Sequence, residues 1–140
     1  MRFDVTTHRC IIVIDQHLSA GLAMNAASVI GIGFGRLTDN LVGPDMQSQD
    51  GVNYPGVIAA PLPVLLAAGD YLRELHGVSE ADEELVAMPF SALAQSCKTY
   101  EEYGERIAAT PSGQIELVAL GLIGPKKKIT RLSGNLKLYR

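Results

Sequence analysis

The residues best suited to chemistry lie in the short polar segment Asp15-Gln16-His17-Leu18-Ser19. The imidazole of His17 can take up or release a proton near neutral pH, as a general acid or base must. Asp15 could orient that imidazole or a water molecule, and Ser19 offers a hydroxyl to a substrate or to the helix that follows. The same residues also fit a polar turn with a capping residue. The sequence leaves both interpretations open.

The elements on either side predict where this segment lies. Residues 10–14 (CIIVI) are continuously apolar and β-branched, which is typical of a central strand covered on both faces. Residues 20–34 are rich in Ala, Leu and Met and uncharged, so they predict a buried helix that Gly31, Gly33 and Gly35 loosen and end. The polar segment would then join the carboxyl end of a strand to the amino end of a helix. Proteins of the α/β class commonly bind ligands there.

The rest of the chain alternates between strand and helix patterns. Residues 38–56 are polar and contain several glycines, and a loop of that length is usually functional or mobile. We expect strands at 57–60, 85–90, 114–123 and 136–139, and helices at 63–76, at 98–109 with Thr99 as its cap, and at 126–133. Strands that alternate with helices predict a three-layer α/β fold, here as one domain over residues 1–140.

Other residues that could do chemistry lack the required spacing. The glycines at 31, 33 and 35 follow a helix, whereas a nucleotide-binding loop joins a strand to a helix. His8, His17 and His76 lie in different segments without ligand spacing, so we predict neither a metal nor a cofactor. Cys97 would be reactive if a neighbouring cation activated the thiol, and is otherwise inert, as we expect for Cys10.

The composition predicts a cytoplasmic protein. The 140 residues are 47% hydrophobic and 19% charged, which excludes a disordered chain, and two cysteines are too few for a disulfide framework. No signal segment opens the chain, and polar or charged residues interrupt each apolar run before it reaches membrane-spanning length. The low charge also predicts that a partner subunit in a homodimer, or helices on both faces of the sheet, cover part of the apolar surface.

Charge is distributed unevenly along the chain. Residues 1–125 carry fifteen acidic and six basic side chains, whereas residues 126–140 carry six basic side chains and no acidic one. Such a segment can contact a phosphate-bearing partner, although it is more often a solvated edge. Three lysines at the start of a helix oppose its dipole, which favours a role other than stability. RNA binding is the weaker alternative, and would involve Lys126, Lys127, Lys128 and Arg131.

Two stretches of the sequence resemble the type 2 peptidyl-tRNA hydrolase family. Residues 11–30 carry the resemblance through Ile12, Val13, Asp15, Gly21, Asn25 and Ala26, and residues 119–138 through Gly124, Pro125, Ile129, Leu132, Gly134, Leu136, Lys137 and Leu138. The resemblance implies a three-layer α/β/α sandwich with a mixed four- to five-stranded sheet, frequent dimers and cleavage of the ester between a peptide and tRNA. The chain looks closer still to a bacterial family of unknown function in the same superfamily.

The chain departs from the hydrolases where their chemistry lies. Residues 17–22 (HLSAGL) stand where the family has a lysine-rich KxGKGK loop, and residues 89–96 (PFSALAQS) where it has Asp-Ala-Gly-x-Thr. Losing the loop's cations removes charges that would hold a phosphate or polarise a carbonyl. We therefore carry over the fold and the place of the site, but not the activity. That site would comprise Asp15, His17, Asn25 and either Ser91 or Gln95.

Two functions remain open on these observations. A small hydrolase acting on an ester or amide would use His17 as its acid–base group, beside Asp15. A non-catalytic binding or regulatory domain would instead hold a small molecule under the 38–56 loop.

Overall fold

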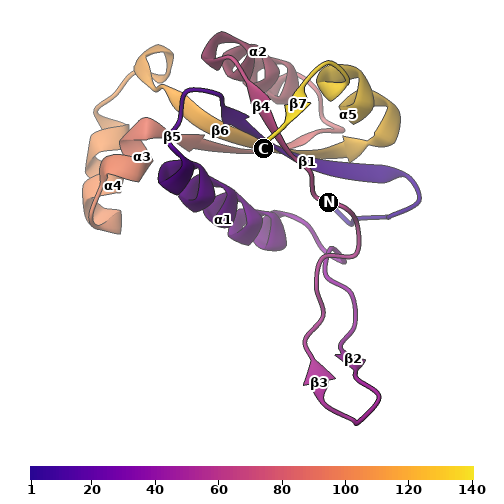
Figure 1. Cartoon of the computed structure of the whole chain (residues 1–140). Coiled ribbons are helices and arrows are strands. Elements are labelled where there is room, and N and C mark those ends of the chain that lie inside the picture. Colours follow the sequence, from indigo (N-terminus) through magenta and orange to yellow (C-terminus); the bar gives the residue numbers. More distant parts are fainter.

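The computed structural model describes all 140 residues, and a five-stranded mixed sheet lies at its centre (Figure 1). The strands are β1 (His8–Asp15), β4 (Val64–Ala67), β5 (Val86–Ser91), β6 (Leu117–Pro125) and β7 (Lys137–Leu138), in the spatial order β5-β6-β1-β4-β7. β1 and β4 are parallel, whereas β6 is antiparallel to both β1 and β5, and β7 is antiparallel to β4. The predicted mixed α/β architecture is confirmed, and β7 lies at an edge as its alternating sequence indicates.

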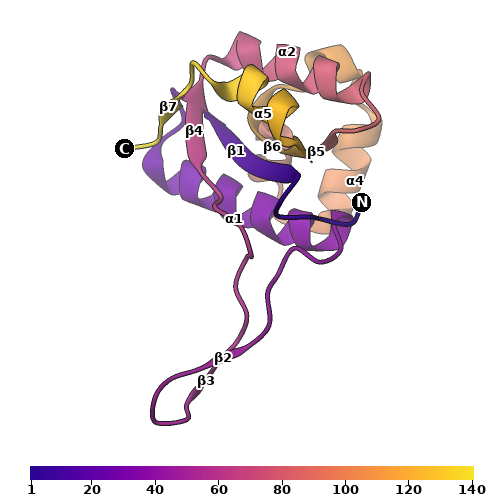
Figure 2. The ribbon, with the colours of Figure 1, turned by 90° about the vertical axis from the view of Figure 1, so that its right-hand side faces the viewer.

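Helices cover both faces of this sheet. α1 (Ala20–Leu37) lies on one face, and α2 (Gly69–Glu80) and α5 (Lys126–Ser133) lie on the other (Figures 1 and 2). Successive residues of β1 point to opposite faces, so Ile12 and Ile14 join the core under α1, while Ile11 and Val13 join the core under α2 and α5. All four side chains are buried. The continuously apolar sequence of this strand is thereby explained.

Two short helices close one end of the sheet. α3 (Ala92–Ser96) follows β5 directly, and α4 (Tyr100–Ala108) follows α3. The Ser91 hydroxyl accepts a hydrogen bond from the amide of Ala94 (3.0 Å), and the Thr99 hydroxyl accepts one from the amide of Glu102 (3.1 Å). Both bonds satisfy amides that a helix leaves free at its start. The predicted helix with Thr99 as its cap is confirmed.

The glycines near the end of α1 do not end the helix. It continues through Gly31, Gly33 and Gly35 to Leu37, beyond the end predicted near residue 34. Gly33 lies close to β5: a Cβ there would lie 2.7 Å from the Sδ atom of Met88, whose side chain would have to move. Close packing on the sheet therefore offsets the low helix propensity of glycine, which costs about 1 kcal/mol per residue relative to alanine.

The region after Pro63 also differs from the prediction. Residues 64–67, expected to begin a helix, form β4 beside β1, and α2 begins only at Gly69. It then continues past Gly77, its predicted end, to Glu80. A proline fits the residue before a strand as well as the first turn of a helix, because neither place needs its amide hydrogen. Pairing with the central strand decides between them.

The segment predicted as a long loop forms an extended arm. β2 (Met46–Gln47) and β3 (Asn53–Tyr54) pair with each other in a hairpin that projects away from the sheet (Figures 1 and 2). An isolated bridge between Val42 and Ile58 joins its two sides near the base. The strand predicted at 57–60 is therefore wrong, since these residues do not join the main sheet.

α1 buries only one of its faces in the single chain. The residues that it buries against the sheet are Ala23, Ala26, Ile30 and Phe34. On the other face Met24 is 66% and Ile32 is 78% exposed. By length and composition alone this helix could span a membrane, with a mean hydropathy of 1.2 over 18 residues, although we expected no apolar run of that length. Its buried face is nevertheless that of a core helix in a globular domain.

Candidate functional site

The carboxyl ends of three strands meet at one edge of the sheet. β1 and β4 are parallel neighbours, and β5 runs in the same direction because β6 is antiparallel to both β1 and β5. α1 follows β1 onto one face and α2 follows β4 onto the other, so a topological switch point lies between them. A carboxylate oxygen of Asp15 lies there, 3.2 Å from where a Cβ on Gly69 would be. The predicted polar segment thus lies where α/β folds commonly bind ligands.

Within this segment only Asp15 is held by its surroundings. Its carboxylate accepts a hydrogen bond from the backbone amide of His17 (2.9 Å), not from the imidazole. The side chain of His17 is exposed, and so is Ser19, which precedes α1 without a side-chain hydrogen bond to the helix. The structure therefore places the three residues side by side, but does not assemble them into a catalytic group.

The three other predicted site residues serve the packing of α3. The side-chain amide of Gln95 donates hydrogen bonds to the carbonyl of Leu22 (2.9 Å) and to Asn25 Oδ1 (3.3 Å), so it attaches α3 to α1. Ser91 is buried and its hydroxyl caps α3. The structure brings Asn25 and Gln95 together in a contact between helices.

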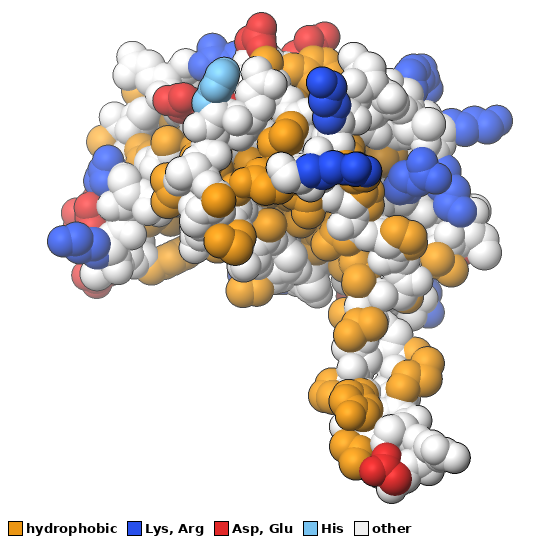
Figure 3. Space-filling model, viewed as in Figure 1, with side chains coloured by type: hydrophobic (Ala, Val, Ile, Leu, Met, Phe, Trp, Pro, Cys, Tyr) orange, Lys and Arg blue, Asp and Glu red, His pale blue; other side chains and the backbone are white.

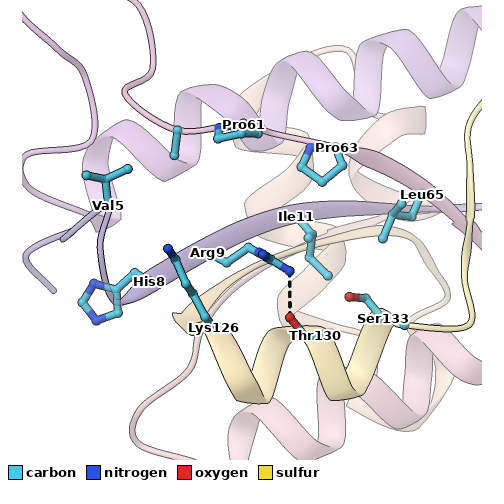
Figure 4. A pocket seen from close by; sticks show the side chains of 12 residues that line it. Val5, His8, Arg9, Ile11, Pro61, Pro63, Leu65, Lys126, Thr130 and Ser133 are labelled. Carbon is cyan, nitrogen blue, oxygen red and sulfur yellow. Dashed lines mark hydrogen bonds between the residues drawn. The ribbon is translucent and has the colours of Figure 1, made fainter.

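A separate pocket lies at the opposite end of β1. It has a volume of about 500 Å³ and lies between the start of β1, the segment returning from the arm, and α5 (Figure 4). Much of its lining is apolar, from Val5, Ile11, Ala60, Pro61, Pro63 and Leu65. This size is within the range of small-molecule sites. We call it the β1–α5 pocket.

Three basic side chains line the β1–α5 pocket, and no acidic side chain does. Arg9 donates a hydrogen bond from Nη1 to Thr130 Oγ1 (2.7 Å), which directs its guanidinium toward α5 (Figure 4). Neither Arg9 nor Lys126 forms an ion pair. The Nδ1 atom of His8 accepts a hydrogen bond from the backbone amide of Asp4 (2.9 Å), so the neutral imidazole carries its proton on Nε2. The pocket therefore presents positive charge and hydrogen-bond donors.

One acidic group lies close to this pocket without lining it. Asp4 accepts hydrogen bonds from the hydroxyl (2.6 Å) and the amide (2.9 Å) of Thr6. The bond from the hydroxyl is the main reason that the pKa of Asp4 lies below its usual value, and the charges of His8 and Lys126 contribute. The carboxylate is thus engaged by Thr6 and does not pair with the cations of the pocket.

Part of the basic C-terminal segment has a structural role. Lys128 Nζ lies 2.7 Å from Asp82 Oδ2 and 2.8 Å from Glu84 Oε1, which attaches α5 to the loop before β5. The bonds to Asp82 and Glu84 raise the pKa of Lys128, and the bond from Lys128 lowers the pKa of Asp82. Lys127 is exposed, whereas Lys126 lines the pocket. The predicted RNA-binding residues therefore differ in their surroundings.

A second cavity is an open groove between α2 and the region of α4. Its volume is about 1140 Å³, and its lining mixes the charges of Asp70, Arg73 and Glu80. Ser91 also lines it, but its hydroxyl already caps α3. Because the groove carries charges of both signs, its lining does not select a ligand of one charge. The β1–α5 pocket is therefore the stronger candidate site.

The histidines and thiols do not gather into a site. The histidines lie at the two ends of β1 and on α2, and no three His, Cys, Asp or Glu side chains lie close enough to share a metal. Cys10 is buried, and burial raises the pKa of its thiol. Cys97 lies 3.5 Å from Nη1 of Arg106, which also donates to Ser96 (3.0 Å).

Comparison with known proteins places this fold in a family. Residues 8–140 match the family described as protein of unknown function (DUF2000). The chain belongs to the DUF2000 family. The fold of this DUF2000 chain is similar to a solved structure of a protein of unknown function from Agrobacterium tumefaciens strain C58, with a TM-score of 0.84. The likeness covers 95% of this chain and 98% of the other at 14% identity, so it concerns the fold alone. No curated protein matches the chain.

The sequence interpretation of this DUF2000 chain missed His8 and Arg9 as site residues. One signal was available, because Arg9 lies two residues before Ile11 and so points to the same face of a strand that is buried on both faces. Arg9 is exposed at the end of this strand, so its charge can meet a ligand from solvent. The prolines that close the pocket, Pro61 and Pro63, lie far away in the sequence, and no local pattern connects them with Arg9.

Proposed function

We propose that this DUF2000 domain binds a small anionic molecule, carrying a phosphate or carboxylate group, in the β1–α5 pocket. The observation that carries the proposal is an apolar lining that contains three basic side chains and no acidic one. Apolar walls with a few placed polar groups are typical of small-molecule sites. Arg9 and Lys126 are exposed and form no ion pair, so both charges are accessible to an anion that enters from solvent.

Arg9 and Lys126 would divide the recognition of this anion. The hydrogen bond from Arg9 to Thr130 uses one guanidinium donor and fixes the plane of the group, so the remaining donors can meet two oxygens of a phosphate or carboxylate. Lys126 would add a point charge from the start of α5, and the apolar wall would contact the uncharged part of the ligand. No residue in the lining is arranged as a nucleophile, which favours binding without turnover.

Calorimetry and thermal shift measurements with inorganic phosphate, a nucleoside monophosphate and a dicarboxylate test this proposal. Hydrogen bonds to charged groups contribute about 1.5–3 kcal/mol, so Arg9→Gln with Lys126→Gln should weaken binding at least about 10-fold. Lys127→Gln is the matched control, because this neighbouring lysine lies outside the pocket. The proposal fails if no probe binds the unaltered protein, or if Lys127→Gln weakens binding as much as the pocket variant.

RNA is a competing ligand for the same basic segment. Binding through phosphate contacts falls steeply with salt and should depend on Lys127 and Arg131 as much as on Lys126. Titration of a tRNA at two salt concentrations separates the cases. Tight tRNA binding that Lys127→Gln weakens would show that the ligand is RNA and not a small anion.

Hydrolysis of an ester or amide is the second candidate function. It is favoured by the position of Asp15 and His17 at the switch point between β1 and β4. His17→Ala should then abolish turnover of a fluorogenic ester while the melting temperature stays within a few degrees. Equal turnover by the variant would remove His17 from the reaction.

We also propose that the domain is a cytoplasmic relative of the type 2 peptidyl-tRNA hydrolases that does not catalyse their reaction. The motif residues in 11–30 and 119–138 support the relationship, and the missing lysine-rich loop supports the loss of activity. Incubation with peptidyl-tRNA should leave the ester intact. Enzymatic release of tRNA would contradict this part of the proposal.

A further inference from the structure

We infer that two copies of this chain form a symmetric dimer in which the arm of each copy packs along the exposed face of α1 in the other. The arm is defined as residues 42–57, which include β2 and β3. The inference concerns assembly and is independent of the proposed ligand. It rests on the exposed surface of the arm, the uncharged face of α1, the total surface of the chain and the matching lengths of the two elements.

The arm exposes apolar side chains to an unusual degree. The exposed members are Val42, Met46, Val52, Tyr54 and Val57, the last of them 75% exposed (Figure 3). Met46 and Tyr54 lie directly opposite each other on the two strands. An isolated two-stranded hairpin is marginally stable in water, and needs a third strand or another surface against its apolar face. No other part of this chain supplies that surface, because β2 and β3 pair only with each other.

The arm has a defined conformation despite this exposure. The carboxylate of Asp45 accepts hydrogen bonds from the amide of Gly56 (2.9 Å) and from the side chain of Asn53 (3.3 Å), which ties the two sides together. Gly51 adopts a positive φ of 86° in the turn. Gly56 lies against the backbone of Gly43 so closely that no side chain would fit. The apolar side chains are therefore presented on a shaped hairpin, as a docking element requires.

The outer face of α1 is the matching surface. No Asp, Glu, Lys or Arg occurs from residue 16 to residue 35, and Met24 and Ile32 stand out from this helix into solvent. The arm leaves the chain shortly after α1 and projects beyond the same face of the sheet that α1 covers (Figures 1 and 2). The two apolar surfaces therefore adjoin at an angle. In a dimer with two-fold symmetry, the arm of each copy can cover α1 of the other copy. Both apolar surfaces are then covered in both copies, as a closed dimer requires.

The total surface also indicates a missing partner. A compact monomer of 15.0 kDa should expose about 7,000 Å² by the usual scaling of surface with mass. This chain exposes 8828 Å². The excess of about 1,800 Å² is more than the roughly 800 Å² that each partner buries in a stable interface of standard size. The surplus is therefore sufficient for a dimer.

Length and charge agree with the exchange of arms. The nine residues of one side of the arm, 42–50, reach at most about 30 Å, and the 18 residues of α1 extend about 27 Å. The arm carries two carboxylates, Asp45 and Asp50, and no cation. Arg36, near the end of α1, is exposed and forms no ion pair within its own chain. An acidic arm and a helix whose one cation is unpaired are complementary between copies.

Sedimentation velocity measurements test the dimer. The unaltered chain should sediment at twice 15.0 kDa at micromolar concentration. Val57→Asp on the arm and Ile32→Asp on α1 should each raise the dissociation constant about 30-fold or more, as loss of a central apolar anchor does. Gln114→Asp is the matched control, since it adds the same charge at an exposed polar position outside both the arm and α1. A monomeric unaltered chain, or equal weakening by the control, overturns the inference.

Disulfide trapping tests which surfaces meet. In a Cys97→Ser background, one sample carries Val57→Cys and another carries Ile32→Cys, while Cys10 stays buried and unreactive. Oxidation of the mixture should join position 57 of one chain to position 32 of the other, and should produce little dimer in either sample alone. Joining of position 57 to position 57 would mean that the arms pair with each other, which overturns packing on α1. Both substituted positions are exposed, so the fold should be retained, and circular dichroism verifies it.

A lipid surface is the other occupant that an apolar helix face could have. A monomeric chain that floats with phosphatidylcholine vesicles, and loses this property in Ile32→Asp, would assign the face of α1 to lipid and overturn the dimer. A dimer that does not float supports the inference.

Discussion

The two ends of β1 carry opposite chemistry on the same face of one strand. Arg9 and Asp15 both point toward the side of the sheet covered by α2 and α5, with Ile11 and Val13 buried between them about 20 Å along the strand. At the carboxyl end Asp15 is half-buried, and neither it nor His17 lines the β1–α5 pocket or the groove, whereas at the amino end the exposed cations Arg9 and Lys126 line the β1–α5 pocket. A favourable strand end is therefore not sufficient for a site, because the walls of a pocket come from segments elsewhere in the chain.

The largest expected difference between the two ends is in ligand affinity. Arg9→Gln should weaken binding of the best anionic probe about 10-fold or more, because a charged hydrogen bond is lost. Asp15→Asn, at the other end of the strand, should change the affinity less than twofold. Calorimetric titration of both variants measures the contrast, and the reverse order would move the site to the carboxyl end.

The next largest expected difference between the two ends of β1 is in the free energy of unfolding, and one glycine at each end measures it. Gly124 pairs with Arg9 at the amino end of β1. A Cβ on Gly124 would lie 2.5 Å from Leu85 and 3.2 Å from the carbonyl of Glu84. Gly124→Ala should therefore destabilise the fold by about 1–3 kcal/mol. At Gly69→Ala the Cβ meets only the carboxylate of Asp15, which can move, and helix propensity improves by up to about 1 kcal/mol. Urea denaturation of the two variants measures both values. Equal destabilisation would show that the two ends are equally tightly packed.

A smaller effect concerns the ion pairs that hold α5 beside the pocket. The lowered pKa of Asp82 contributes stability above its ordinary value of 3.8, and this contribution is lost as the pH falls through the folded pKa. The raised pKa of Lys128 contributes stability below 10.5, and this is lost as the pH rises through the folded pKa. Lys128→Met should therefore lower the melting temperature by a few degrees at pH 7 and by less at a pH well below 3.8. An equal decrease at both pH values would assign the effect to packing.

The smallest effect on stability should come from His17, which lies just beyond the carboxyl end of β1. His17→Ala should change the free energy of unfolding by less than about 0.5 kcal/mol, because the side chain is exposed and unbonded. Chemical denaturation measures this value. A larger loss would mean that His17 is covered in solution, for example by a second copy of the chain.

Several elements could be predicted because short-range interactions determine them. A run of five apolar residues identified β1, and the hydroxyl of Thr99 identified the start of α4. The place of Asp15 between the carboxyl end of a strand and the start of a helix followed from the order of those two elements. Each of these signals lies within a few residues of the feature that it predicts.

The β1–α5 pocket, the arm and the true limits of β4 and α1 required the tertiary structure. VLLA becomes β4 because it pairs with β1, and α1 continues through its glycines while Ile30 and Phe34 are buried against the sheet. Arg9 and Pro61 meet only after the chain has passed through α1 and the arm. The sequence by itself thus determined the class of fold, the principal strands and the capped helices, since local patterns encode them. Which end of β1 lies beside a basic pocket depended on contacts between distant residues, which no local pattern contains.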